Sequence, residues 1–345
     1  MFLNKTKEPL LLPGSGSFVF EIPINGLPAA LSLFPNNPVF LPDSFVQTQK
    51  KHTGLKWILA GLVFAVLWSS ASTATKVALT VSQPLVIAVM RFGVAAFIML
   101  IIAHLVLRKP LPRKKEWKPL IIYGMLNITI YLGLYVIAMQ QVTASIGALT
   151  VAVSPVFISF ISVFFLKKPL PLRILLAICI CLLGILVVAW PLLGGASVTP
   201  LGLILLLASM LSYSIGTIYF SSRSWGQMHL FVINGWQTFF GGLLMLPIAL
   251  YTYKGTANHY TAAFWGGTLW LAIPVSIGAV ALWLHLLKQD AVKAGMWLFI
   301  CPVFGIIIAA LWVHDPVSIY TIAGVLMVLA GLALSQLEKR KTDKH

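Results

Sequence analysis

Few charged side chains lie inside the long apolar stretches of this 345-residue sequence, so the exceptions are the first candidates for chemistry. Lys76 and Arg91 stand about 5 and 12 Å below the nearer ends of their predicted helices, at about 1.5 Å per residue. A charge held in lipid is costly, which makes each a candidate for binding or gating. The alternatives are that Lys76 reaches the membrane surface and that Arg91 binds backbone carbonyls.

No acidic residue lies in the middle of an apolar stretch. The full set of acids is Glu8, Glu21, Asp43, Glu116, Asp290, Asp315, Glu338 and Asp343. A cationic solute would therefore find no buried counter-charge, and proton antiport through a membrane carboxylate has no candidate residue. Two fixed cations without acids favour an anionic or zwitterionic metabolite, such as an amino acid or an organic anion.

Uncharged polar and aromatic side chains recur at helical spacing along several apolar stretches. The candidates to line a cavity, in addition to Arg91 and Lys76, are Ser69, Thr73, Asn127, Tyr131, Tyr135, Tyr213, Thr217 and Trp283. Serine and threonine stripes also bond helix to helix, and tryptophan near a span end often anchors it at the interface. Pro155 and Pro302 each interrupt a helix ladder, as a hinge or as a simple kink.

The elements that must position these residues follow from composition. Hydrophobic residues make up 59% of the chain and charged residues 9%, against about 25% charged in a soluble protein. Ten stretches reach the length of about 20 apolar residues that a membrane helix needs. They are Leu55–Leu79, Pro84–Leu107, Trp117–Met139, Ala144–Leu166, Leu172–Trp190, Leu201–Phe220, His229–Tyr251, Trp265–Leu287, Ala291–Val313 and Val317–Leu337. We therefore expect an all-α polytopic membrane protein with ten transmembrane helices.

Cofactors and metals are not expected. Cys179, Cys181 and Cys301 lie in apolar runs without histidines or acids at metal-ligand spacing, so we interpret them as packing residues. No glycine-rich nucleotide-binding loop is present.

The two ends and the basic charge indicate an orientation. Prolines interrupt residues 1–53, which we interpret as a cytoplasmic tail without regular structure, and residues 338–345 form a basic tail. Lysines and arginines between spans fall almost entirely on the side of the amino terminus, which is typical of the cytoplasmic side. This spacing explains the net charge of +16 without nucleic acid as a partner. We expect a multi-pass protein of a cell membrane, specifically a bacterial inner membrane, with both termini cytoplasmic.

An internal repeat divides the chain. A shift of 147 residues places Ser154-Pro155-Val156-Phe157 on Cys301-Pro302-Val303-Phe304 and Gly184 on Gly331. In the earlier spans Arg91 falls near Gln237. The division gives a repeat at residues 54–190 and another at 199–337, each with five spans. Five is odd, so the second repeat must cross the membrane upside down, as in transporters that work by alternating access.

The sequence resembles the drug/metabolite transporter superfamily, in its ten-helix EamA-type branch. The resemblance covers about residues 55–337 and rests on the span count, Leu67-Trp68-Ser69-Ser70, the segment from Pro84 to Arg91 and the paired Pro-Val-Phe turns. It implies a solute carrier, commonly an exporter, with a central cavity between the halves. The competing interpretations are a non-transporting receptor or assembly protein and a membrane-embedded enzyme. No grouped catalytic residues favour the enzyme.

Overall fold

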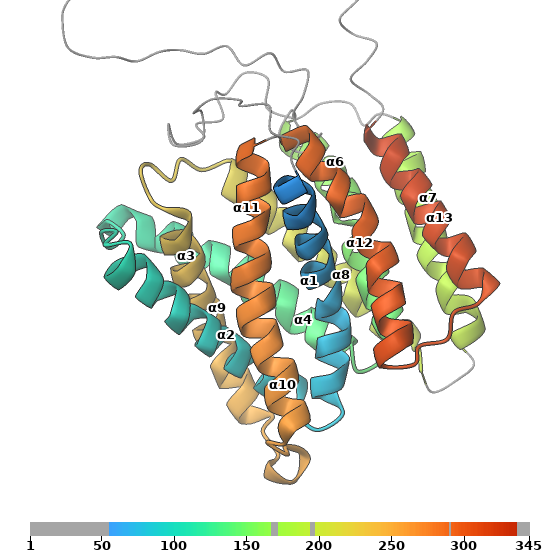
Figure 1. The fold of residues 1–345 in the computed structure, drawn as a ribbon, viewed down its shortest axis with the longest axis horizontal. Helices are drawn as coiled ribbons and strands as arrows, with labels where there is room; N and C mark the ends of the chain where they lie inside the picture. Colours follow the sequence, from blue (N-terminus) through green and yellow to red (C-terminus); the bar gives the residue numbers. More distant parts are fainter. Residues whose placement is uncertain (1–54, 167–171, 194–196, 290, 337–345) are drawn as a thin grey trace, which may run out of the picture.

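The helices of the computed structural model lie side by side in one bundle (Figure 1). The structure describes residues 55–166, 172–193, 197–289 and 291–336, and every regular element within these ranges is helical. The predicted tails at residues 1–53 and 338–345 lie outside the described residues.

The helical elements follow one another along the chain in this order. They are α1 (Leu55–Leu79), α2 (Pro84–Ile101), η2 (Ile102–Val106), α3 (Lys114–Gly124), η3 (Met125–Ile130), α4 (Tyr131–Ala138), α5 (Ala144–Val151), α6 (Ser154–Leu166), α7 (Leu172–Ala189), η4 (Trp190–Leu192), α8 (Pro200–Ser221), α9 (Leu230–Tyr251), η5 (Gly255–Ala257), α10 (Ala262–Trp270), η6 (Leu271–Ala279), α11 (Val280–Gln289), α12 (Ala291–Trp312) and α13 (Ile319–Gln336).

Eight helical runs in the described residues are long and apolar enough to cross a membrane, from Leu55–Leu79 to Ala262–Trp283. Two shorter apolar helices, Ile300–Trp312 and Ile319–Ser335, fall within the predicted ninth and tenth spans. The helical fold class is therefore confirmed for the described part of the chain. Ten crossings remain a prediction.

The distribution of side chains suits a lipid environment. Large apolar side chains such as Leu311 and Trp312 are about three-quarters exposed, at 74% and 73%. Small hydroxyl residues such as Ser209 and Ser214 are fully buried between helices. Lipid can cover the apolar outer surface, whereas a hydroxyl inside the bundle can bond a neighbouring carbonyl.

Close packing between the two halves depends on glycine. The helices α7 and α13 stand side by side (Figure 1). A Cβ atom on Gly184 would lie 2.8 Å from the carbonyl oxygen of Gly324, and one on Gly331 would lie 2.9 Å from that of Ala177. The 147-residue shift converts the first of these contacts into the second. The repeat seen in the sequence is therefore matched by a pair of equivalent contacts.

The helices α2 and α9, which the predicted repeat makes equivalent, run in opposite directions. At the start of α2, Nε2 of Gln83 donates to the carbonyl of Thr252, just past the end of α9, at 2.8 Å. At the far end of this pair, Nε1 of Trp236 donates to Nε2 of His104 at 3.1 Å. Opposite directions are what an inverted repeat requires of equivalent helices.

Candidate functional site

Arg91 lies on the buried side of α2 and is only 6% exposed. Its Nε and Nη2 both donate to Oγ of Ser276, at 3.2 and 3.1 Å. Ser276 belongs to η6, a π-helical stretch that contains Pro274, and its hydroxyl donates to the carbonyl of Leu271 at 2.8 Å. Proline lacks the amide hydrogen that a regular helix would use, and π-helical turns inside α-helices are frequent at functional sites.

The guanidinium of Arg91 keeps donors for a further partner. It has five N–H groups, and the hydroxyl of Ser276 accepts hydrogen bonds only from Nε and Nη2. Within the described ranges no carboxylate pairs with it. The acids described there, Glu116 and Asp315, lie near helix starts and accept backbone amide hydrogen bonds. A planar guanidinium without an acidic partner is suited to bind a carboxylate through two parallel hydrogen bonds.

Two tyrosines of α4 lie near Arg91, and a third, on α8, contacts one of them. Tyr131 and Tyr135 of α4 lie within electrostatic range of its guanidinium, and both are buried. The ring of Tyr131 lies with its centroid 4.9 Å from that of Tyr213 on α8 and 6.3 Å from that of Tyr135. The structure thus brings together predicted residues from three separate spans. The tyrosine rings form a connected aromatic cluster, and Tyr131 and Tyr135 are its members near the cation.

Asn127 forms a second polar contact, in the π-helical stretch η3. Its Nδ2 donates to Oε1 of Gln237 on α9 at 3.2 Å, and Nε2 of Gln237 donates to Oδ1 of Asn234 at 3.0 Å. The Oδ1 atom of Asn127 is buried and accepts no hydrogen bond from the residues that the structure describes. A buried acceptor left unpaired costs about 1–3 kcal/mol, so this atom is suited to accept a hydrogen bond from a ligand.

These two contacts occupy matching places in the two halves. Arg91 on α2 contacts the π-helical stretch of the α10–η6–α11 run, and Gln237 on α9 contacts the π-helical stretch of the α3–η3–α4 run. The sequence repeat already places Arg91 near Gln237. Each contact therefore joins the two halves, and one pairs a cation with a hydroxyl where the other pairs two amides.

Lys76 of α1 reaches the backbone one helical turn after Tyr135. Its Nζ donates to the carbonyl of Met139, which follows α4, at 2.9 Å, and the side chain is half-buried. Asp315 is close enough to attract the ammonium group, and its Oδ2 accepts from the backbone N–H of Ser145 at the start of α5 at 2.8 Å. This cluster joins α1, α5 and the loop before α13 near one end of the bundle.

We expect Asp315→Ala to lower the free energy of unfolding by about 1 kcal/mol, because a carboxylate at a helix start stabilises the free amide groups there. Thermal unfolding of the purified protein in detergent measures this. Asp315→Asn should retain most of the stability, since its side-chain oxygen can still accept from Ser145. An alanine variant as stable as the unmodified protein would contradict this role.

Several predicted cavity residues lie elsewhere or bond within the bundle. Oγ of Ser69 donates to the carbonyl of Cys301 at 2.8 Å and so joins α1 to α12. Oγ1 of Thr217 donates to its own helix at the carbonyl of Tyr213. Trp283 stacks on Phe64, with ring centroids 5.1 Å apart, in a cluster separate from the tyrosines.

Thr73 differs from these residues, because its Oγ1 is buried without a hydrogen-bond partner among the described residues. It lies one turn before Lys76 on α1. A ligand that reached Lys76 could therefore also bond this hydroxyl.

The two predicted hinges differ in structure. The helix breaks at residues 152–153, just before Pro155, and resumes as α6. The hydroxyl of Ser154 bonds the carbonyl of Val151, which Pro155 leaves without its usual amide partner. Pro302 instead lies inside the continuous helix α12. Only the first proline coincides with a helix break, so Pro155 is the stronger hinge candidate.

Two residues of the site, Ser276 and Gln237, are absent from the set of cavity residues predicted from the sequence. Ser276 is one of two hydroxyl residues in its apolar span, with Thr268, and Pro274 two residues earlier was the available signal. Gln237 was visible as the repeat partner of Arg91. Neither pairing could be read from helical spacing, because each joins different helices.

Comparisons with known proteins agree with this architecture. A transporter of Bacillus subtilis (strain 168), described as uncharacterized transporter YvbV, is 24% identical over 289 residues, which are 84% of this chain and 92% of that protein. Protein PecM of Dickeya dadantii (strain 3937) is 26% identical over 275 residues, covering 78% of this chain and 89% of that protein. A solved crystal structure has a TM-score of 0.57 and 19% identity over 82% of this chain and 96% of its own, which shows a shared fold.

The sequence profile of the EamA-like transporter family matches the chain twice, at residues 55–190 and 200–337. Each match spans one of the two repeats. The resemblance inferred from the residue motifs is therefore confirmed, and the chain belongs to the EamA-like transporter family.

Proposed function

We propose that this protein is a secondary transporter that exports a small metabolite carrying a carboxylate, such as an amino acid or an organic anion, by alternating access. Its family and the names of its relatives indicate a membrane transporter rather than an enzyme. The proposal adds the class of solute, the direction and the mechanism.

The observation that carries the proposal is the buried Arg91, held by Ser276 and facing no acid in the described part of the chain. A carboxylate would supply the missing counter-charge through the free side of the guanidinium. The tyrosine rings beside it offer an apolar surface to the rest of the solute. In this proposal the Oδ1 atom of Asn127 accepts a hydrogen bond from an ammonium or hydroxyl group.

Alternating access is supported by the two-fold repetition of the helices. The equivalent helices α2 and α9 run antiparallel, and the contacts of Gly184 and Gly331 match under the 147-residue shift. Two halves of opposite orientation can exchange conformations and so expose one site to either side in turn. The break before Pro155 offers a place for this movement.

We further propose that repeats at residues 54–190 and 199–337 form the transport unit in a cell membrane, the bacterial inner membrane, with both termini cytoplasmic. The support is the bias of lysine and arginine toward one set of loops. Lipid and a small solute are the expected partners.

A comparison of solutes in cells that lack and cells that overproduce the chain tests the function. We expect overproduction to lower the cellular content of at least one carboxylate-bearing metabolite and to raise it in the medium. The Arg91→Ala variant, which we expect to be inactive, is produced at the same level as a control. It distinguishes an effect of transport from an effect of protein overproduction. A change confined to cationic solutes would contradict the proposal.

A further inference from the structure

A basic cavity of about 540 Å³ lies at one end of the bundle, at the side predicted to be cytoplasmic. Its walls come from the segment between α2 and α3, the first turns of α3 and the segment between α8 and α9. Four cations line it, and they are Lys109, Arg113, Lys115 and Arg223. Glu116 is the acid of the lining, so the charge of the basic cavity is strongly positive. Its volume is typical of small-molecule sites, which range from about 300 to 1,000 Å³.

Local structure maintains this cavity. Oε2 of Glu116 accepts from the backbone N–H of Arg113 at 2.6 Å and is thereby used in capping α3. The guanidinium of Arg223 lies over the ring of Tyr219, 4.9 Å from its centroid. The turn that follows contains Gly226 at φ +57°, a conformation that favours glycine. Nε1 of Trp225 donates to the carbonyl of Phe220 at 2.8 Å, which holds the other wall.

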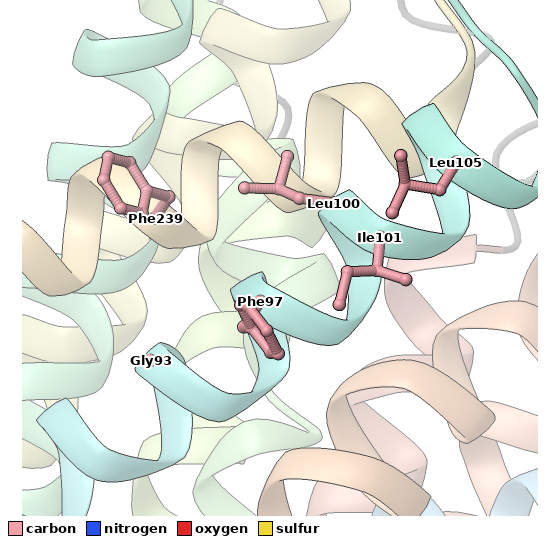
Figure 2. Close-up of a pocket in the computed structure, with 6 residues that line it drawn as sticks. All are labelled: Gly93, Phe97, Leu100, Ile101, Leu105 and Phe239. Carbon is pink, nitrogen blue, oxygen red and sulfur yellow. The ribbon is translucent and has the colours of Figure 1, made fainter.

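An apolar groove of about 440 Å³ lies on the outer side of α2, against α9. Figure 2 shows the residues that line it, which are Gly93, Phe97, Leu100, Ile101, Leu105 and Phe239. Phe97 and Leu105 are exposed, in contrast to Arg91, which lies on the buried side of the same helix. The apolar groove is therefore distinct from the proposed solute site and faces the region that lipid occupies.

The apolar groove and the basic cavity are neighbours. Phe239 of the groove contacts the ring of Trp236, with centroids 5.7 Å apart, and Trp236 contacts Trp117 at 4.7 Å. Trp117 follows Glu116 of the cavity in the sequence. Nδ1 of His104 also bonds the carbonyl of Lys109, a cavity residue, at 2.8 Å. A band of aromatic side chains thus separates a charged site from an apolar one, as at a membrane interface.

We infer that the two sites together bind one anionic phospholipid. The phosphate group occupies the basic cavity, and an acyl chain lies in the apolar groove. Lysine and arginine beside the cytoplasmic ends of membrane helices attract anionic headgroups, and an apolar groove alone would not select among lipids. The charge of the cavity therefore gives specificity, while the groove favours a ligand with a hydrocarbon chain over a free phosphate.

Native mass spectrometry of the purified full-length chain tests this inference, with dioleoyl phosphatidylglycerol and dioleoyl phosphatidylcholine supplied together. We expect preferential retention of phosphatidylglycerol. Each cation removed near a membrane surface should weaken binding of the anionic lipid about fivefold, so Arg113→Gln with Arg223→Gln should weaken it roughly 25-fold. Lys254→Gln, which removes an exposed cation at the other end of the bundle, is the matched control and should change nothing.

A second variant tests the apolar groove. A Cβ on Gly93 would meet no atom within 4 Å, so Gly93→Leu fills the groove without disturbing the helix packing. It should weaken binding of the dioleoyl lipid severalfold and leave binding of dihexanoyl phosphatidylglycerol unchanged. Equal retention of the two dioleoyl lipids by the unmodified chain would overturn the inference. So would inorganic phosphate that displaces the lipid at equal concentration, because it would identify a free phosphate as the ligand.

Discussion

Arg91→Ala is expected to abolish transport while leaving membrane insertion intact. A solute carboxylate would lose two charge-assisted hydrogen bonds, worth about 1.5 kcal/mol or more each, so transport at low solute concentration should fall by about 100-fold or more. The fold should survive because the hydroxyl of Ser276 still donates to the carbonyl of Leu271. Uptake or efflux of the solute identified in the cellular comparison measures the loss. Size-exclusion chromatography of the detergent-purified variant checks folding.

Two further variants separate charge from geometry at this position. Arg91→Lys keeps the cation but loses the planar pair of donors, so it should retain only part of the activity. Ser276→Ala removes the group that orients the guanidinium and should reduce affinity for the solute while retaining transport at saturating concentration. Normal solute flux through the Arg91→Ala variant would show that Arg91 does not bind the solute.

Gly184→Val should be strongly destabilising. The added Cβ would lie 2.8 Å from the carbonyl oxygen of Gly324, and backbone atoms on a packed helix cannot move aside as a flexible side chain can. Overpacking of this kind costs about 3 kcal/mol, and separation of α7 from α13 would lose further contacts. A lower unfolding temperature in detergent, with less protein recovered in the membrane, is the expected measurement.

Gly93→Val is the matched control. It adds the same side chain to a membrane helix at a position where the new Cβ would meet no atom within 4 Å. Gly331→Val should resemble Gly184→Val, because its Cβ would lie 2.9 Å from the carbonyl of Ala177 in the equivalent contact. If Gly184→Val and Gly93→Val unfolded at the same temperature, the close approach of the two helices would be refuted.

The difference between these two matching contacts bears on how a repeated scaffold acquires a directional site. Arg91 with Ser276 and Gln237 with Asn127 occupy matching places, yet only the first pair carries charge. In the proposed site, the charge of the first pair would give the solute one preferred orientation. The neutral amides on the other side can bond polar groups without competing for the carboxylate. A duplicated chain can thus keep its symmetrical packing while its ligand contacts diverge.

The sequence by itself determined the helical fold class, the repeat and the family. Helix positions follow from apolar length, and the start of α2 at Pro84 was predicted to the residue. The 147-residue shift made Gly184 and Gly331 equivalent before any contact was known. These features are local or periodic, so they can be recognised in a single sequence.

Only the tertiary structure decided which polar residues meet. Arg91, Tyr131 and Tyr213 lie on three helices, and their convergence depends on how α2, α4 and α8 pack. Helical spacing treats Ser69 and Asn127 alike, but the first bonds a carbonyl between helices and the second keeps an unpaired oxygen. A stripe of polar residues fixes the face of a helix on which they lie. What that face contacts is set by long-range packing, which no local pattern records.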